Sequence, residues 1–82
     1  MLTRPMATNP ETVLDLRGLR CPQPVLRAKK ALRTIPVGGT LVLECTDPLT
    51  AIDIPNLLRQ TGDTLEGNAE AEGVLSFRIR KK

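Results

Sequence analysis

The chain has 82 residues and a formal net charge of +3, with two cysteines, a single aromatic residue and no histidine. A domain of this length buries only about 60–65 % of the surface of its unfolded chain, so a deep enclosed active site is not expected. The missing histidine excludes Cys–His and Ser–His nucleophile pairs, and two cysteines are too few ligands for a structural zinc site. No run of Asp and Glu has the spacing of a calcium loop, so we expect neither a metal nor a cofactor.

The first residues and the cysteine count bear on domain organisation and location. Residues 1–11 carry two prolines and little apolar content, which predicts a flexible tail before a single domain over residues 12–82. No segment resembles a signal peptide or reaches the length of a membrane span, about 18 apolar residues. Because a secreted domain of this size usually holds several disulfides, we expect a cytoplasmic protein with reduced thiols and no membrane contact.

Hydrophobic periodicity predicts strands and helices in alternation. Leu14 and Leu16 mark the inner face of a first strand, and apolar residues at positions 25, 28, 32 and 35 form the buried stripe of a first helix. Glu72-Gly73 has the sequence of a tight hairpin turn. The predicted strands lie at residues 12–17, 40–46, 63–70 and 74–80, and the predicted helices at residues 22–34 and 54–61.

This order of elements predicts an α+β fold. The first crossover contains a helix, so the first two strands should be parallel and joined in the right-handed sense. The last two strands form an antiparallel hairpin. Both helices must then cover one face of a four-stranded mixed sheet, which gives a two-layer α/β sandwich with the order βαβαββ.

The motif Cys21-Pro22-Gln23-Pro24 stands at the junction of the first predicted strand and helix. We predict Cys21 at the N-cap and Pro22 at the first helical position, which suits a residue without an N–H. The positive end of the helix dipole would then favour the thiolate, the nucleophilic form of cysteine. Cys21 is therefore the candidate reactive residue.

Neighbouring residues are expected to assist this thiolate. Arg17 and Arg20 add positive charge just before the predicted helix. Since both prolines of the motif lack an N–H, Gln23 is the best-placed donor to the sulfur. The alternative is that Cys21 is a structural capping residue, although Ser, Thr, Asp and Asn are the residues preferred at that position.

Cys45 needs a separate interpretation. It ends the second predicted strand, which runs parallel to the first, so it could lie at the same sheet edge as Cys21 and act as a resolving thiol. The alternation of Leu41, Leu43 and Cys45 favours a core position instead.

A basic cluster precedes and follows the motif. Six of the twelve basic residues fall within positions 17–33, with no acidic residue between them. Such clusters attract acidic protein surfaces or nucleic acid, and Arg27, Lys30 and Arg33 are the candidates for partner docking. A solvated helix face is the alternative. Phe77 is the only aromatic residue, so there is no platform for stacking bases and direct nucleic-acid binding is not expected.

Residues 14–24, LDLRGLRCPQP, closely resemble the signature of TusA/SirA-like sulfur carriers. Asp47-Pro48, Asp53-Ile54-Pro55 and Gly62 are also similar to the pattern of that family, and the resemblance covers roughly residues 12–80. It implies a two-layer sandwich similar to the C-terminal domain of translation initiation factor three. Gln23 stands where family members often have Glu, and Asp63 stands where many relatives of the tRNA-thiolation type have His.

The resemblance also implies a function. Cys21 would accept sulfane sulfur as a persulfide, commonly from a cysteine desulfurase, and pass it to an acceptor protein. Such carriers serve tRNA thiolation, molybdenum cofactor maturation or sulfur oxidation, and they exchange persulfides with partners rather than act as stand-alone enzymes. A monomer suits this shuttle. The alternatives are a non-catalytic adaptor that uses the basic helix face and, ranked last, an RNA-binding protein.

Overall fold

The computed structural model describes residues 11–82, along which four strands and two helices follow one another. Of the predicted tail over residues 1–11, only Glu11 is described, and it begins the first strand; the remainder lies outside the described residues. Within residues 11–82, neither helix has the length and apolar character needed to cross a membrane. The elements are β1 (Glu11–Leu16), α1 (Gln23–Leu32), β2 (Thr40–Cys45), α2 (Thr50–Thr61), β3 (Thr64–Ala71) and β4 (Val74–Arg80).

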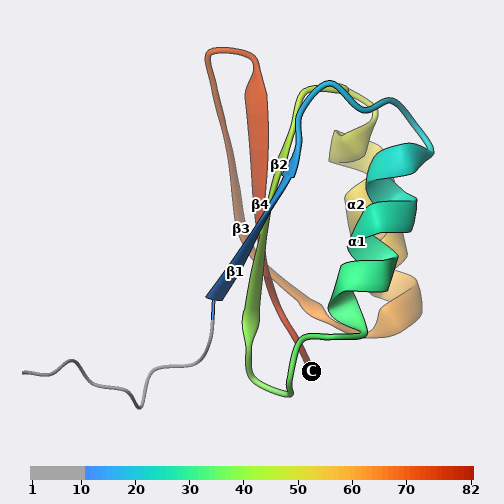
Figure 1. Cartoon of the computed structure of the whole chain (residues 1–82), viewed down its shortest axis with the longest axis vertical. Coiled ribbons are helices and arrows are strands. Elements are labelled where there is room, and N and C mark those ends of the chain that lie inside the picture. Colours follow the sequence, from blue (N-terminus) through green and yellow to red (C-terminus); the bar gives the residue numbers. More distant parts are fainter. Residues whose placement is uncertain (1–10) are drawn as a thin grey trace, which may run out of the picture.

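The four strands form one mixed sheet in the order β1-β2-β4-β3. β1 and β2 are parallel, and β3 and β4 are antiparallel, as the helical crossover and the hairpin predicted. β4 is also antiparallel to β2, which the sequence did not predict. Both helices lie on one face of the sheet (Figure 1). The predicted α+β class, the βαβαββ order and the two-layer sandwich are therefore confirmed.

The core lies between the helices and the inner face of the sheet. Leu41, Leu43 and Cys45 alternate along β2 and are fully buried, and Phe77 on β4 is the register partner of Leu43. Alternate residues of the strands and the apolar stripe of α1 thus form the same apolar layer. The buried apolar residues of the two helices are Pro24, Ala28, Leu32, Ile54, Leu57 and Leu58.

The second helix is longer than the sequence predicted. A short turn and a separate later helix were expected, but α2 is continuous over Thr50–Thr61 with Pro55 inside it. The Thr50 N–H donates to the Asp47 carbonyl at 3.0 Å, so the preceding turn leads directly into the helix. Pro55 has no N–H to donate to the carbonyl of Ala51, one helical turn earlier. Because Ala51 is exposed, water can bond that carbonyl instead. The other boundaries agree with the prediction to within two residues, and both ends of β4 coincide with it.

The hairpin between β3 and β4 turns at Glu72-Gly73, as predicted. Both residues have positive φ values, 52° and 79°, which is the geometry of a type I′ turn and which glycine adopts without strain. On the outer face of the sheet, Arg80 Nε lies 2.5 Å from Glu66 Oε2, and Arg78 Nε lies 4.0 Å from Glu66 Oε1. Ion pairs therefore cover part of the face that the helices leave open.

The parallel pairing of β1 and β2 brings two connecting segments to one end of the sheet. Leu16 and Cys45, the last residues of the two strands, are register partners. The β1–α1 and β2–α2 segments consequently leave the sheet at the same end (Figure 1). Side chains that are far apart in the sequence meet there, and this end carries the candidate site.

Phe77→Ala should destabilise the domain by about 3–5 kcal/mol, because it removes the largest fully buried side chain and leaves a cavity. Urea unfolding followed by circular dichroism measures the change. Val37→Ala is the matched control, since Val37 is 81 % exposed and its truncation should change the free energy of unfolding by less than about 0.5 kcal/mol. Equal losses in the two variants would contradict the placement of the core.

Candidate functional site

Cys21 lies in the segment between β1 and α1, and its side chain is exposed. The predicted N-cap position is wrong by one residue, because α1 begins at Gln23 and Pro22 is its N-cap. The Gln23 N–H donates to the Arg20 carbonyl at 2.8 Å and closes a turn in which the Cys21–Pro22 peptide bond is cis. That hydrogen bond also corrects the prediction that the Gln23 N–H serves the sulfur.

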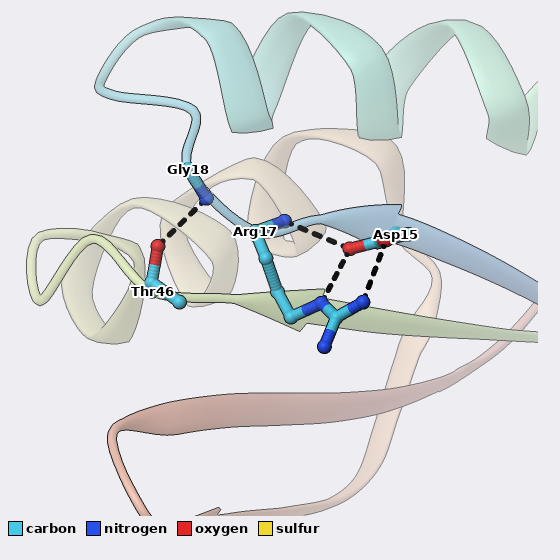
Figure 2. Close-up of polar contacts among 4 residues, drawn as sticks. All are labelled: Asp15, Arg17, Gly18 and Thr46. Atoms are coloured by element: carbon cyan, nitrogen blue, oxygen red, sulfur yellow. Dashed lines mark hydrogen bonds and ion pairs between the residues drawn. The ribbon is translucent and has the colours of Figure 1, made fainter.

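Two hydrogen bonds tie the Cys21 segment to the segment after β2. The Cys21 N–H donates to Asp47 Oδ2 at 2.7 Å, and the Gly18 N–H donates to Thr46 Oγ1 at 2.8 Å (Figure 2). Gly18 has a φ of 85°, which a residue with a side chain rarely adopts, so glycine allows the sharp turn out of β1. Asp47 also accepts from the Leu49 N–H at 3.0 Å through its other oxygen. The backbone beside the sulfur is therefore fixed by the neighbouring segment.

The thiol of Cys21 donates a hydrogen bond to Asp53 of α2, with Sγ 3.0 Å from Oδ2. The pKa of the Cys21 thiol is raised above its ordinary value by this hydrogen bond, by loss of hydration and by the negative charges of Asp53 and Asp47. The prediction of an environment that favours the thiolate is therefore wrong for the free protein. Two carboxylates near the sulfur stabilise its protonated form and oppose the dipole of α1.

The two arginines expected to support the thiolate are engaged differently. Arg17 pairs with Asp15, with Nε 2.9 Å from Oδ1 and Nη2 3.0 Å from Oδ2 (Figure 2). The side-chain hydrogen bond from Arg17, with its backbone N–H and its charge, lowers the pKa of Asp15 to about 2. Arg20 adds its charge to the hydrogen bonds that lower the pKa of Asp47. This corrects the role expected of both arginines, because each acts on a nearby carboxylate.

Cys21 borders two hollows of the molecular surface. The larger, about 570 Å³, is formed by the β1–α1 and β2–α2 segments and includes Arg20, Asp47 and Leu49 in its lining. The smaller, about 270 Å³, lies between the helices. A visiting group can therefore approach the sulfur from either side. The smaller hollow is lined by Cys21, Pro22, Val25, Asp53, Asn56, Leu57 and Gln60.

Within residues 11–82, no group of three or more Cys, Asp and Glu side chains is placed to hold a metal ion.

The other motif residues serve the helix start. Pro22 precedes the first helical residue, and Pro24 is buried in the first turn of α1. Neither proline donates an N–H, so the donors of this turn are few, as predicted. The motif therefore anchors the helix start while its cysteine stays at the surface.

The predicted docking residues Arg27, Lys30 and Arg33 are exposed on and just after α1. In the described part of the chain, the ion pairs involve other residues, so these three charges face solvent. Their exposure is compatible with docking and with a solvated helix face.

Cys45 lies at the end of β2 and is fully buried. Burial raises the pKa of its thiol, and buried cysteines of this kind are unreactive. The core interpretation is therefore confirmed, and the arrangement does not present Cys45 as a resolving thiol.

Asp47 and Asp53 are the site residues that the sequence did not reveal as partners of the sulfur. In the sequence, both stood out only as part of the similarity to the family pattern. The proximity of Asp47 could have been inferred, because it follows the strand that runs parallel to β1. The contact of Asp53 could not, because the sequence predicted that α2 begins after this residue, whereas the helix contains it.

The fold has a close counterpart among solved structures. The crystal structure of a SirA-like protein from Desulfitobacterium hafniense matches with a TM-score of 0.75 and 28 % sequence identity, over 84 % of this chain and 95 % of that chain. The fold and the surface cysteine thus define a small SirA-like domain.

Sequence comparison gives the family. The model of the family described as "Sulfurtransferase TusA" matches residues 12–81. The sulfur carrier protein TusA of Pseudomonas putida strain GB-1 is 40 % identical over 73 residues, which cover 89 % of this chain and 91 % of the relative. That of Pseudomonas entomophila strain L48 is 40 % identical over 72 residues, which cover 88 % and 90 %. The chain belongs to the TusA family of sulfur carriers, and this membership supports a role in a sulfur relay.

Arg17→Gln should raise the pKa of Asp15 from about 2 toward the ordinary carboxyl value, because the hydrogen bonds and charge of the arginine are lost. Carbon-13 NMR titration of the Asp15 carboxyl measures the shift. Since a lowered pKa stabilises the fold above the ordinary value and the effect is lost as pH falls through about 2, wild type and variant should converge in stability at low pH.

The same variant should leave the pH dependence of Cys21 alkylation unchanged, because Arg17 is paired with Asp15. Arg59→Gln is the matched control, since Arg59 donates to Asn56 on α2 and should affect neither titration. A clear rise in the pKa of the Cys21 thiol in Arg17→Gln would instead support the role first predicted for the arginine.

Proposed function

We propose that this protein accepts sulfane sulfur as a persulfide on Cys21 and passes it to a cysteine of an acceptor protein. The observation that carries the proposal is the position of Cys21, which is exposed between two hollows in a chain of a sulfur-carrier family. The other cysteine is buried. The chain acts in persulfide exchange between partner proteins rather than as a stand-alone enzyme.

The chemistry is thiol exchange at a sulfane sulfur. In loading, the deprotonated Cys21 sulfur attacks the terminal sulfur of a donor persulfide. The Sγ–S bond forms as the S–S bond of the donor breaks, and the donor leaves as a thiolate that takes up a proton. In delivery, an acceptor thiolate attacks the terminal sulfur on Cys21, which leaves as a thiolate in turn. Each step moves one sulfane sulfur and needs no external oxidant or reductant.

The partners follow from this chemistry. A cysteine desulfurase is the donor we expect, and the acceptor carries a reactive cysteine. Family membership suggests tRNA thiolation, molybdenum cofactor maturation or sulfur oxidation as the process served. We place the relay in the cytoplasm, with the carrier as a monomer and without direct contact to nucleic acid.

Incubation with a cysteine desulfurase and cysteine should add the mass of one sulfur atom to the protein, and dithiothreitol should remove it. Intact-mass spectrometry measures this gain. Cys21→Ser should take up no sulfur, because it lacks the accepting atom. Cys45→Ala is the matched control and should still be loaded, since that thiol is buried.

A lack of sulfur uptake from any tested desulfurase or low-molecular persulfide would reject the carrier function. That outcome would favour the alternative, an adaptor that binds through the basic face of α1. Sulfur uptake that persists in Cys21→Ser would reject the assignment of Cys21.

Replacement of Arg27, Lys30 and Arg33 by Glu should abolish docking to a desulfurase, because these exposed charges attract an acidic partner surface. At low salt we expect loading from the desulfurase to slow by about tenfold or more. Stopped-flow or quenched loading assays measure the rate. Loading from glutathione persulfide should not change, because that small donor does not use the helix face.

A double variant, Arg59→Glu with Lys82→Glu, is the control for loss of positive charge away from α1; it lowers the net charge by four units, against six in the α1 variant. It places the altered charges on α2 and at the end of the chain, and it should be loaded faster than the α1 variant. Equal rates for the α1 variant and wild type would reject the docking surface.

A further inference from the structure

Asp53 differs from the other carboxylates near the β1–α1 segment in what it binds. Asp47 accepts two backbone N–H groups, and Asp15 forms an ion pair with Arg17. Asp53 is half-buried and accepts the Cys21 thiol at 3.0 Å. Across residues 11–82 it forms no ion pair with a lysine or arginine. Burying a carboxylate without a cation costs free energy, and such a group is therefore a candidate for a functional role.

We propose that Asp53 is a positioning residue that holds the Cys21 sulfur as a hydrogen-bonded thiol in the free carrier, and that a cationic group of the donor protein releases the sulfur by pairing with this carboxylate. The inference rests on the proposed function of Cys21 as the sulfur-accepting residue. It adds the control of reactivity at that atom and one chemical feature of the partner.

The holding step follows from the charges that face the sulfur. Asp53 approaches from α2 and Asp47 from the β2–α2 segment, and both oppose a negative charge on sulfur. Arg20, in the same segment as Cys21, lies beside Asp47 and contributes to its lowered pKa. The Cys21 thiol is the donor and the Asp53 carboxylate is the acceptor of this hydrogen bond, so the proton rests on sulfur.

The release step follows from the lining of the smaller hollow. Asp53 and Cys21 lie in its wall with prolyl, apolar and amide side chains, and no lysine or arginine lines it. A lysine, arginine or protonated histidine of a docked protein can therefore occupy the hollow and meet an unpaired carboxylate. A positive charge within about 4–6 Å of a thiol favours its ionised form.

The proton and electrons balance without a further reactant. When the cation pairs with Asp53, the thiol proton passes to water and the thiolate attacks the terminal sulfur of the donor persulfide. The donor sulfur leaves with the electron pair of the broken S–S bond and takes up a proton from water. The sulfane sulfur has then moved to Cys21, and the released carboxylate can accept a new hydrogen bond after delivery.

The first arm of the test is the rate of Cys21 alkylation by iodoacetamide as a function of pH. Asp53→Asn should move the curve to lower pH and raise the rate at neutral pH by roughly three- to fourfold for every tenfold gain in thiolate. The rate gains less than the thiolate does, because nucleophilicity falls as the pKa falls, with a Brønsted coefficient of about 0.4–0.5. The plateau at high pH should fall for the same reason, so the two curves cross.

Three comparisons make this arm specific. Asp53→Glu keeps a carboxylate and should restore part of the wild-type curve. Glu66→Gln is the matched control, since this carboxylate pairs with Arg80 on the outer face of the sheet and its removal should leave the curve in place. A change that only exposed or disordered the segment would move neutral and plateau rates in the same direction. An unchanged curve for Asp53→Asn would reject the holding role.

The second arm compares two donors with wild type and Asp53→Asn. Loading from glutathione persulfide should become faster in the variant by the same factor as alkylation. Loading from a cysteine desulfurase should not gain this factor, because the cation of the docked donor already releases the wild-type thiol. An equal gain with both donors would reject the release by a partner. If wild type takes up no sulfur from either donor, the proposed function fails, while the alkylation curves still decide whether Asp53 holds the thiol.

Discussion

The site depends on the parallel pairing of β1 and β2. This pairing brings the ends of the two strands together, and the Asp47 carboxylate then links the following segments through the N–H groups of Cys21 and Leu49. A domain of this size has little interior in which to enclose reactive groups. It instead fixes the backbone beside one surface sulfur, and the side chain of that residue remains open to a partner.

The electrostatics of the site set two opposite effects against each other. Cys21 lies just before the N-terminus of α1, where the helix dipole favours a thiolate. Asp53 and Asp47 favour the thiol, and the pKa of the Cys21 thiol is raised. A direct hydrogen bond to a carboxylate outweighs the partial charge of a helix end, because the dipole effect is worth less than about 1 kcal/mol at most exposed sites. Both carboxylates thus favour the protonated form of the Cys21 thiol, which is the less reactive form.

The sequence predicted those features that depend on local periodicity and left out those that depend on packing between elements. Alternation along β4 and the Glu72-Gly73 turn identified the hairpin, and the first crossover identified the parallel pair. The partner of the sulfur was missed because it lies 32 residues further along the chain, on the first part of a helix whose start was predicted too late. Neither propensity nor spacing reports which side chain of α2 reaches the loop before α1. The error over Arg17 has a different origin, because its charge is taken by Asp15, only two residues away in the sequence.

Charges of opposite sign lie on two separate parts of the surface, along α1 and around the Cys21 sulfur. Arg27, Lys30 and Arg33 form a basic surface along α1, whereas Asp47 and Asp53 make the surroundings of the sulfur acidic. Under the two proposals, the donor would carry acidic residues opposite α1 and a cation beside its own reactive sulfur. Small oxidants and alkylating agents offer neither. In the proposed mechanism, the arrangement that slows the thiol toward such molecules does not slow it toward a docked donor, because the donor brings the cation that the smaller hollow lacks.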